Sequence, residues 1–566
     1  MSTKVQELYQ QLKYDHRDRK TKAVARSTMR GKVAKAFISQ PMAHNIGSAQ
    51  KGLQLADGNF LVGGLLVRDP DEPIWNVEPD NPAFQKKAHG FFWLDHLAAN
   101  GSLDCCLTAR SWFADWLVRF GDGHSFAWTP ELAGARIISM INHAIMLMGN
   151  TTGEAQKNYF ASISHHARFL KKRWQYAPEG FPKFQALVGY VYSALALEEF
   201  SKDLKPALQA LTGECESYFT QTGGIPSRNP EELLDIFTLL VWVDQGMTSA
   251  SFKPDRALLN AIEIIAPAIR TLRMGDGNLA EFHGGCSSTA KRIDQIITDS
   301  GARATFTADE IMGYSRVEKG ASVLIVDTGK IPDIESYARS FDCSLALEFS
   351  SGDHPIFKSQ GTGHDLSEPQ IHASQAATGF TVASLQPIFS EKAKQRKTRA
   401  VALDPDMDIA YLRSDKLLDA TSIITASQTG YQADYGLIYE RKLELISHGY
   451  ALSGTDRFYC GGESNRNRFD KSILDQEGQS IPFVAVFHIA PDVEAALDLG
   501  GTAVSLQLPN NEMWIFKASG GKLALKDSLY FTSERIRPRA TKQIVVTSHV
   551  VNYEGEINWL LTRLEN

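Results

Sequence analysis

Residues 322–327 read Ser-Val-Leu-Ile-Val-Asp (SVLIVD), the first of several short apolar runs that begin after about residue 300. The other runs are SLALEF (344–349), FVAVFH (483–488), VSLQL (504–508) and QIVVT (543–547), and turns rich in glycine separate them. Many short strands without intervening helices are typical of antiparallel sheets. We therefore predict an antiparallel β-sandwich domain over residues 301–566.

The pattern before residue 300 is helical. In the segments 88–99, 111–120 and 184–197, apolar residues recur at i, i+3, i+4 and i+7, as in amphipathic helices. Pro and Gly punctuate the chain between these segments, and no strand pattern intervenes. Residues 81–300 are therefore predicted to be all-α, built from helical hairpins that suit either a toroid or a solenoid. Residues 1–80 are an N-terminal arm and an irregular lead-in.

Composition excludes several classes of protein. The 566 residues carry 59 Lys and Arg against 65 Asp and Glu, which gives a net charge of −6, so the global basic surface of a nucleic-acid-binding protein is missing. The six cysteines form no CxxC pair, which argues against a zinc ribbon or a disulfide framework. The N-terminus lacks the apolar core of a secretory signal, and the most apolar stretch, 137–148, is too short for a membrane span. We expect a cytoplasmic protein.

A series of short motifs, in order along residues 80–565, resembles the heparinase II/III-like polysaccharide lyases. Phe91–Leu97 (FFWLDHL) is similar to the FxWLxxL element of that family, and Gly223–Pro230 (GGIPSRNP) is similar to its GGhxxRxP turn. The remaining motifs are GDG at 275–277, FHGG at 282–285, GYSR at 313–316, LIVD at 324–327, LEF at 347–349, GTDR at 454–457 and FHIAP at 487–491.

The resemblance implies an α+β multidomain fold, in which an incomplete (α/α) toroid precedes the β-sandwich and a cleft between them takes an acidic polysaccharide. The resemblance is a better guide to the fold than to the catalytic residues. The family's Asn-His pair falls on Glu179–Phe184, and its Tyr-His pair falls on Glu231–Leu233. The metal ligands of some relatives have no obvious counterpart, so we expect no metal and no cofactor.

A uronate lyase must neutralise the substrate carboxylate, remove the C5 proton and protonate the leaving oxygen. Arg228 and Asn229 are the first candidates, because both could grip the carboxylate beside Pro230, which begins a helix. The alternative is structural: Asn229 would be only the N-cap of that helix, and Arg228 would form a loop salt bridge.

His283 and Tyr314 complete the predicted catalytic set. His283 lies next to glycines that let the backbone approach a ligand, so it could act as the base or donate a hydrogen bond to the sugar; the alternative is a turn histidine. Tyr314 could exchange the proton, and Arg316 lies two residues further along the same predicted strand, on the same face, where it could bind the carboxylate. The alternative for this pair is packing at a strand edge.

Further residues are predicted to bind substrate. Arg339 falls near the first sandwich histidine of the family, His364 and His372 flank an acidic loop, and Tyr439 falls where the family has another histidine. Trp112 could stack on a sugar ring, although tryptophans at core spacing in helices more often pack inside the protein.

The first hypothesis is therefore a lyase that cleaves a uronate-containing glycan by β-elimination. The alternatives are a non-catalytic protein that binds anionic glycans in envelope polysaccharide metabolism, and a glycoside hydrolase on a toroid scaffold, with Glu231, Glu232 and Glu281 as the available acids. The expected partner is an acidic oligosaccharide or polysaccharide, with no nucleic acid and no membrane span; a homodimer is left open.

Overall fold

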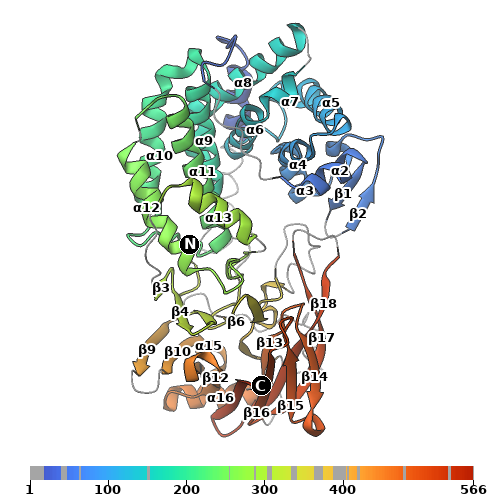
Figure 1. The fold of residues 1–566 in the computed structure, drawn as a ribbon. Helices are drawn as coiled ribbons and strands as arrows, with labels where there is room; N and C mark the ends of the chain where they lie inside the picture. Colours follow the sequence, from blue (N-terminus) through green and yellow to red (C-terminus); the bar gives the residue numbers. More distant parts are fainter. Residues whose placement is uncertain are drawn as a thin grey trace. The chain divides into compact units, whose positions relative to one another are not determined.

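A computed structural model gives the fold of the chain (Figure 1). It describes residues 18–39, 47–62, 65–149, 153–253, 255–285, 289–302, 309–332, 341–361, 374–386, 403, 407–416, 421–475, 480–532 and 537–564. The chain forms two compact units. The first comprises residues 1–219, 235–264 and 296–302, and the second comprises residues 220–234, 265–295 and 303–566. The chain therefore changes unit several times, instead of once near residue 300 as the sequence pattern predicted.

The first unit consists of helices, with one small antiparallel hairpin. Its elements are α2 (Ala49–Ala56), β1 (Asn59–Val62), β2 (Leu65–Arg68), η1 (Ile74–Asn76), α3 (Pro82–His89), α4 (Phe92–Asn100), α5 (Leu103–Phe120), α6 (Pro130–Asn142), α7 (Ala144–Met148), α8 (Gly153–Arg173), η2 (Trp174–Tyr176), α9 (Phe181–Ala196), η3 (Glu198–Asp203) and α10 (Leu204–Tyr218). Helices α11 (Pro230–Ser249), α12 (Arg256–Thr271) and α13 (Ala290–Asp299) contribute residues to both units.

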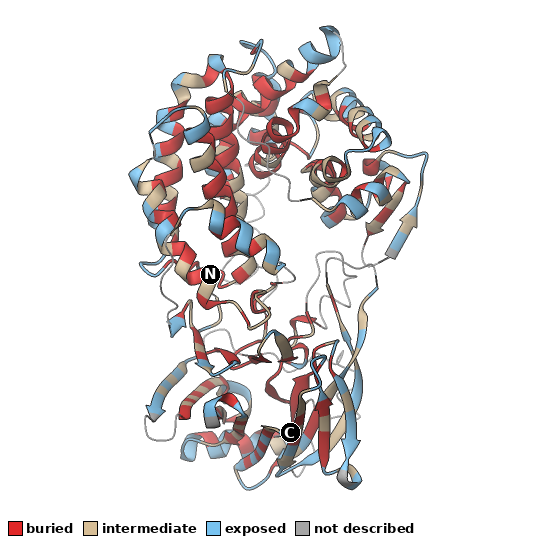
Figure 2. Ribbon diagram, viewed as in Figure 1, coloured by how far each residue is buried: buried red, intermediate tan, exposed pale blue. Residues whose placement is uncertain are grey.

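Helices α6 and α9 form the centre of the first unit. Most residues of both helices are buried, and Figure 2 shows their ribbons mainly in red. They approach closely at Gly134 and Gly189, where a Cβ atom on Gly189 would lie 2.7 Å from the Cα atom of Gly134. A side chain at either glycine would force the two helices apart. Glycine at both positions therefore permits this close contact.

The second unit is built from antiparallel sheets. Its strands are β3 (Glu310–Ile311), β4 (Tyr314–Lys319), β5 (Ser322–Asp327), β6 (Leu347–Ser351), β7 (His354–Phe357), β8 (Ala383–Leu385), β9 (Ile409–Lys416), β10 (Thr421–Tyr431), β11 (Leu437–Ile446), β12 (Ala451–Tyr459), β13 (Ile481–His488), β14 (Glu494–Asp498), β15 (Ala503–Gln507), β16 (Met513–Ser519), β17 (Lys522–Tyr530), β18 (Arg539–Val550) and β19 (Glu554–Arg563). Short helical turns η4 (Ala377–Gly379), η6 (Ser447–Gly449) and η7 (Leu499–Gly501) and helices α15 (Gln432–Tyr435) and α16 (Glu463–Asp475) connect them.

Three sheets share these strands. An eight-stranded sheet has the order β14-β15-β16-β19-β12-β11-β10-β9, a four-stranded sheet has the order β17-β18-β13-β8, and a five-stranded sheet has the order β3-β4-β5-β6-β7. Phe487 of β13 contacts Phe516 of β16 and Trp559 of β19, with ring centroids 4.8 and 4.9 Å apart. The four-stranded and eight-stranded sheets therefore pack face to face through a shared aromatic core, as in a sandwich.

The division predicted from the sequence, a helical half followed by an antiparallel β half, is confirmed. The run SVLIVD is strand β5 over the same residues, and the segments 111–120 and 184–197 lie almost entirely within α5 and α9. The segment 88–99 is divided between α3 and α4, because Phe91 has a left-handed backbone (φ 65°). No helix among the described residues is long and apolar enough to cross a bilayer.

Candidate functional site

Three of the four residues predicted to be catalytic lie together in the second unit. Arg228 precedes α11, His283 lies in the stretch 279–285, and Tyr314 begins β4. Asp327, the last residue of β5, joins them: it accepts hydrogen bonds from Arg228 Nη2 and pairs with His283 Nε2 at 3.0 Å. The Tyr314 hydroxyl donates to the main-chain carbonyl of Arg228 at 2.6 Å.

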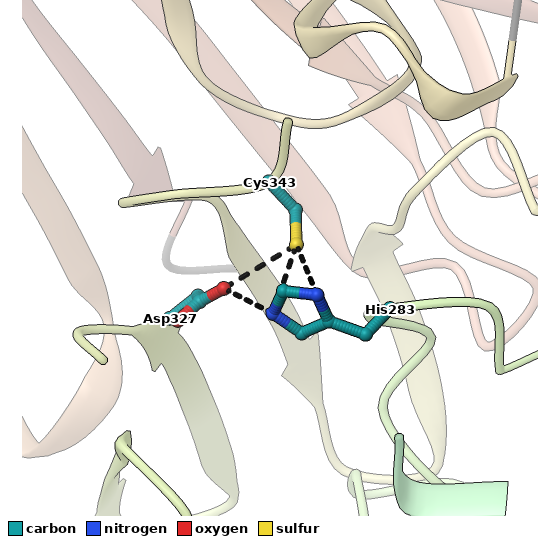
Figure 3. Close-up of side chains that lie close together, drawn as sticks. All are labelled: His283, Asp327 and Cys343. Atoms are coloured by element: carbon teal, nitrogen blue, oxygen red, sulfur yellow. Dashed lines mark hydrogen bonds and ion pairs between the residues drawn. The ribbon is translucent and has the colours of Figure 1, made fainter. Parts of the chain in front are cut away.

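Cys343 completes this cluster. Its Sγ lies 3.3 Å from both Asp327 Oδ2 and His283 Nε2, and Figure 3 shows the three side chains pointing toward one another. We refer to Arg228, His283, Tyr314, Asp327 and Cys343 as the Asp327 cluster. All five side chains are buried.

Arg228 is fully engaged within the cluster. Besides its ion pair with Asp327, Nε donates to the Met312 carbonyl and Nη1 to the Lys330 carbonyl, both at 2.7 Å. Asn229 also has a structural contact, because its Oδ1 accepts from the main-chain N–H of Glu231 at 2.9 Å and of Glu232 at 3.3 Å. These contacts match the structural alternative from the sequence, in which Asn229 caps α11 and Arg228 forms a loop salt bridge.

Burial sets the protonation states in the Asp327 cluster. Burial works against ionisation of Asp327, yet the neighbouring Arg228 and His283 hold the pKa of Asp327 below its ordinary value. Burial lowers the pKa of His283 and raises the pKa of Tyr314 and of Cys343 well above their ordinary values. The cluster therefore holds one ion pair, Arg228–Asp327, surrounded by a neutral imidazole, phenol and thiol.

The other predicted binding residues lie elsewhere. Tyr439 is buried in the sandwich, where its hydroxyl donates to Asp456 at 2.6 Å beside the buried Arg441–Asp456 ion pair. Arg316 donates to the carbonyl of Thr271 and pairs with Glu318 at 2.8 Å. Trp112 is only 8% exposed in the core of the first unit. Arg339, His364 and His372 lie outside the described residues.

A cavity of about 450 Å³ lies within the second unit. Its walls come from the stretch 276–281, the β6–β7 hairpin, the segment after β13, and the facing ends of β17 and β18. The lining residues are Asp276, Asn278, Leu279, Glu281, Thr289, Asp353, His354, Pro355, Lys358, Ala490, Pro491, Asp492, Pro509, Tyr530, Thr532 and Arg539. A cavity of this size lies within the range of sites that bind small ligands.

The buried side of the cavity carries a group of hydrogen-bonded titratable residues. Glu281 Oε1 accepts from the Tyr530 hydroxyl at 2.6 Å and from Lys358 Nζ at 2.9 Å. Lys358 Nζ also lies 3.4 Å from the Tyr530 hydroxyl. Burial raises the pKa of Tyr530, so its phenol is neutral near pH 7; burial opposes the charge on Lys358, but the adjacent Glu281 holds the pKa of Lys358 well above its ordinary value.

Glu348 lies behind this group. Burial, and then repulsion by Glu281, raises the pKa of Glu348 to about 8, so that its carboxyl is largely protonated near pH 7. Its Oε1 accepts from the main-chain N–H of Glu281 at 3.2 Å and of Ser359 at 3.1 Å. Its Oε2 is buried without a hydrogen-bond partner among the described residues. We refer to Glu281, Glu348, Lys358 and Tyr530 as the Glu281 group.

More accessible polar pairs line the rest of the cavity. His354 Nε2 lies 3.2 Å from Asp353, and Arg539 forms an ion pair with Asp492, whose side chain is 67% exposed. Exposed pairs of this kind contribute little stability, so Arg539 can exchange Asp492 for another carboxylate at small cost. The cavity thus offers a phenol, an imidazole and a guanidinium to a ligand.

Sequence reasoning singled out Glu281 only as an acid for hydrolysis, and it missed Lys358, Tyr530, Asp327 and Cys343 as site residues. A signal was present in two cases: Asp327 and Lys358 each place a charge at the end of an apolar strand run, SVLIVD and HPIFK. A charge that continues a buried run needs a buried partner. Nothing local in the sequence marks Tyr530, which reaches the cavity through the pairing of β17 with β18.

Comparison with known proteins places these sites within a known fold. Residues 302–560 match the family model described as "Heparinase II/III-like, C-terminal". A crystal structure of heparinase III superimposes with a TM-score of 0.69 at 11% sequence identity, covering 96% of this chain and 89% of that chain. The heparan sulfate lyase HepC from Pedobacter heparinus superimposes with a TM-score of 0.52 at 12% identity, covering 98% and 88%.

A curated relative aligns over most of its length. FtsZ-localized protein C of Caulobacter vibrioides is 24% identical over 515 residues, which are 89% of this chain and 86% of that protein. The solved structures show the shared fold, a helical toroid followed by an antiparallel β-sandwich. Residues 302–560 thus match the C-terminal domain of the heparinase II/III-like proteins, and the chain as a whole has the fold of heparinase III.

Proposed function

We propose that this protein is a carbon–oxygen lyase that cleaves a uronic-acid-containing glycan by β-elimination. One observation carries the proposal: a chain with the heparinase III fold has a polar cavity lined by the side-chain types that this reaction needs. The cavity of the second unit, with the Glu281 group at its buried side, is where we expect the glycan to bind.

In this proposal each step of the reaction is assigned to a different cavity residue. Arg539 releases the exposed Asp492 and neutralises the uronate carboxylate, which makes the C5 proton more acidic. His354 takes that proton. The C4–O bond breaks as the C4=C5 double bond forms, and the leaving oxygen takes the proton of the Tyr530 hydroxyl. A neutral phenol suits the role of acid, and Glu281, bonded to it at 2.6 Å, supports its reprotonation from solvent.

The residues first predicted to be catalytic have a different role in this proposal. Arg228, His283 and Tyr314 are positioning residues, because they are buried and their polar atoms are occupied by one another and by main-chain groups. They fix the stretch 279–285, in which Glu281 is two residues from His283. Asn229 supports the same region as the cap of α11. The binding roles of Arg339, His364 and His372 stay predictions.

The test is a lyase assay with a panel of uronate oligosaccharides. A lyase produces a 4,5-unsaturated uronate that absorbs in the ultraviolet, whereas a hydrolase releases a reducing end without this chromophore. We expect absorbance to rise with the wild-type chain, and we expect Arg539→Ala to lower kcat as well as weaken substrate binding, because the guanidinium stabilises the negative charge that develops when C5 loses its proton. A reducing end without absorbance would replace the lyase by a hydrolase that uses Glu281.

A second candidate is a protein that binds anionic glycans without cleaving them, in envelope polysaccharide metabolism. Two observations favour it: the saturation of the Asp327 cluster, and the likeness to a relative that is named for its localization with FtsZ. In that case the chain would act in the cytoplasm at an FtsZ-containing site. Thermal stabilisation by uronate oligosaccharides, with no product of either kind, would favour this candidate over the lyase.

A further inference from the structure

The Asp327 cluster brings three different metal-binding atoms together. His283 Nε2, Asp327 Oδ2 and Cys343 Sγ form a triangle with edges of 3.0, 3.3 and 3.3 Å. They come from three separate segments: the stretch 279–285, the end of β5 and the segment before β6. Figure 3 shows each side chain directed at the other two.

This triangle fits a tetrahedral zinc ion with little movement. Zinc binds imidazole nitrogen at about 2.0–2.1 Å, carboxylate oxygen at about 2.0–2.2 Å and thiolate sulfur at about 2.3 Å, so its ligand atoms are roughly 3.4–3.6 Å apart. The edges of the triangle therefore need to lengthen by only a few tenths of an ångström. A mixed nitrogen, oxygen and sulfur set favours zinc over magnesium or calcium, which prefer oxygen ligands.

The surroundings hold the three side chains in this arrangement. His283 has a left-handed backbone (φ 50°), as does Arg228 (φ 55°), and neither is a glycine. Such strain persists only where the neighbouring structure enforces it, and it is common at ligand sites. The second oxygen of Asp327 accepts from Arg228 and from the main-chain N–H of Gly329 at 3.2 Å. Hydrogen bonds to the free oxygen orient a metal-binding carboxylate in the same way.

Hydrogen bonding among neutral groups explains the position of the Cys343 thiol less well than metal binding does. A thiol is a weak donor and a weak acceptor, so burying one beside a carboxylate and an imidazole gains little. Its sulfur lies 3.3 Å from Asp327 Oδ2 and 3.3–3.6 Å from both ring nitrogens of His283. A thiolate on a metal ion would give the same position a strong bond.

We propose that His283, Asp327 and Cys343 bind a zinc ion that ties the stretch 279–285 to strand β5 and to the segment before β6. A water molecule would be the fourth ligand. Binding converts the Cys343 thiol to a thiolate and releases its proton, so the bound site carries a zinc ion, two anionic ligands and the neighbouring Arg228. The role is structural, since the site is buried, and it is independent of whether the cavity performs lyase chemistry.

The test measures metal directly in the full-length chain. The protein is purified without chelator, dialysed and analysed for zinc, and a second sample is stripped and loaded with cobalt, whose thiolate complex has a charge-transfer absorption band. We expect one zinc per chain and a cobalt–thiolate band. Cys343→Ser, which keeps the size of the side chain, should lose the band and most of the zinc, whereas the control Cys460→Ser, a cysteine outside the cluster, should keep both.

Three results would overturn the proposal. The first is a wild-type chain without zinc whose melting temperature is unchanged by added zinc. The second is a cobalt complex without the thiolate band. The third is a Cys343→Ser chain that keeps its zinc. If Cys343→Ser fails to fold, the metal content and cobalt spectrum of the wild type still decide the first two points, and His283→Gln replaces it for the third.

Discussion

The second unit contains two groups of titratable side chains whose members Glu281 and His283 are two residues apart in the sequence. The two groups differ in their surroundings. His283 belongs to the Asp327 cluster, which is closed and whose charges are paired with each other. Glu281 belongs to the Glu281 group, which has similar chemistry but lies beside a cavity of about 450 Å³. The comparison teaches that residue types alone do not separate a structural cluster from a candidate binding site, and that an adjoining cavity does separate them.

The largest effect should come from breaking the ion pair of the closed cluster. Asp327→Ala leaves the guanidinium of Arg228 buried without a counter-ion, and removing one partner of such a pair costs about 3–5 kcal/mol. We expect the urea midpoint to fall accordingly. In the control Asp527→Ala, which removes an exposed ion pair with Lys542, the midpoint should not change measurably. Equal midpoints for the two variants would show that the closed cluster has no structural role.

The next effect separates the open group from the closed cluster by activity. Tyr530→Phe removes the hydroxyl that we propose as the proton donor, and loss of a general acid typically costs about 10²–10⁴-fold in rate. We expect kcat for formation of unsaturated uronate to fall within this range, while the midpoint of unfolding changes little. Tyr553→Phe is the matched control, because its hydroxyl also lies near a carboxylate, that of Asp470, but on the surface. Full activity in Tyr530→Phe would remove this residue from the mechanism.

A pH series tests the protonated carboxyl of Glu348. Its pKa of about 8 in the folded chain lies above the ordinary value of 4.5, so the folded state binds the proton more tightly than the unfolded state. This group therefore makes the protein less stable as the pH rises from about 4.5 to about 8, and it adds no further change above pH 8.

Glu348→Gln should remove this dependence. Glutamine keeps an acceptor for the two main-chain N–H groups and cannot ionise, so the stability of the variant relative to wild type should increase between pH 5 and pH 8. A shift of even one pKa unit is worth about 1.4 kcal/mol. Urea titrations at several pH values measure this difference. Parallel curves for the two proteins would mean that Glu348 is already ionised at neutral pH.

The smallest effect distinguishes the two readings of Asn229. As the N-cap of α11, it contributes about 1 kcal/mol to stability, and serine can replace it in this role. Asn229→Ala should therefore lower the midpoint of unfolding, and Asn229→Ser should leave both the midpoint and the activity near wild type. A large loss of activity in a stable Asn229→Ser chain would restore the substrate-binding role that the sequence suggested.

The sequence was informative where local patterns determine structure. The run SVLIVD predicted strand β5, and helical spacing predicted α5 and α9, because apolar periodicity reports which face of an element is buried. It also selected Arg228, His283 and Tyr314, which do lie together, since a short motif such as GGIPSRNP specifies a turn in which each residue has a fixed place. Their mutual burial was not predictable, because it depends on strands and turns far apart in the chain.

The cavity was harder to foresee for the same reason. Lys358, Tyr530 and Arg539 come from the end of β7 and the facing ends of β17 and β18, and the register of those strands is set by long-range pairing. Helix α16 and the hairpin β1–β2 were also missed. The segment of α16, ESNRNRFDKSILD, is so polar that its apolar periodicity is faint. The hairpin lies in a stretch that had been assigned to an irregular lead-in.

A crystal structure of the wild-type chain with an unsaturated uronate disaccharide, the product of the proposed reaction, tests the central claim most directly. We predict the sugar in the cavity of the second unit, with its carboxylate on Arg539 and a ring oxygen or hydroxyl within hydrogen-bond distance of Tyr530. The Asp327 cluster should be unchanged in that structure. A sugar bound away from the cavity, or one that opens the Asp327 cluster and contacts His283 and Arg228, would contradict the account.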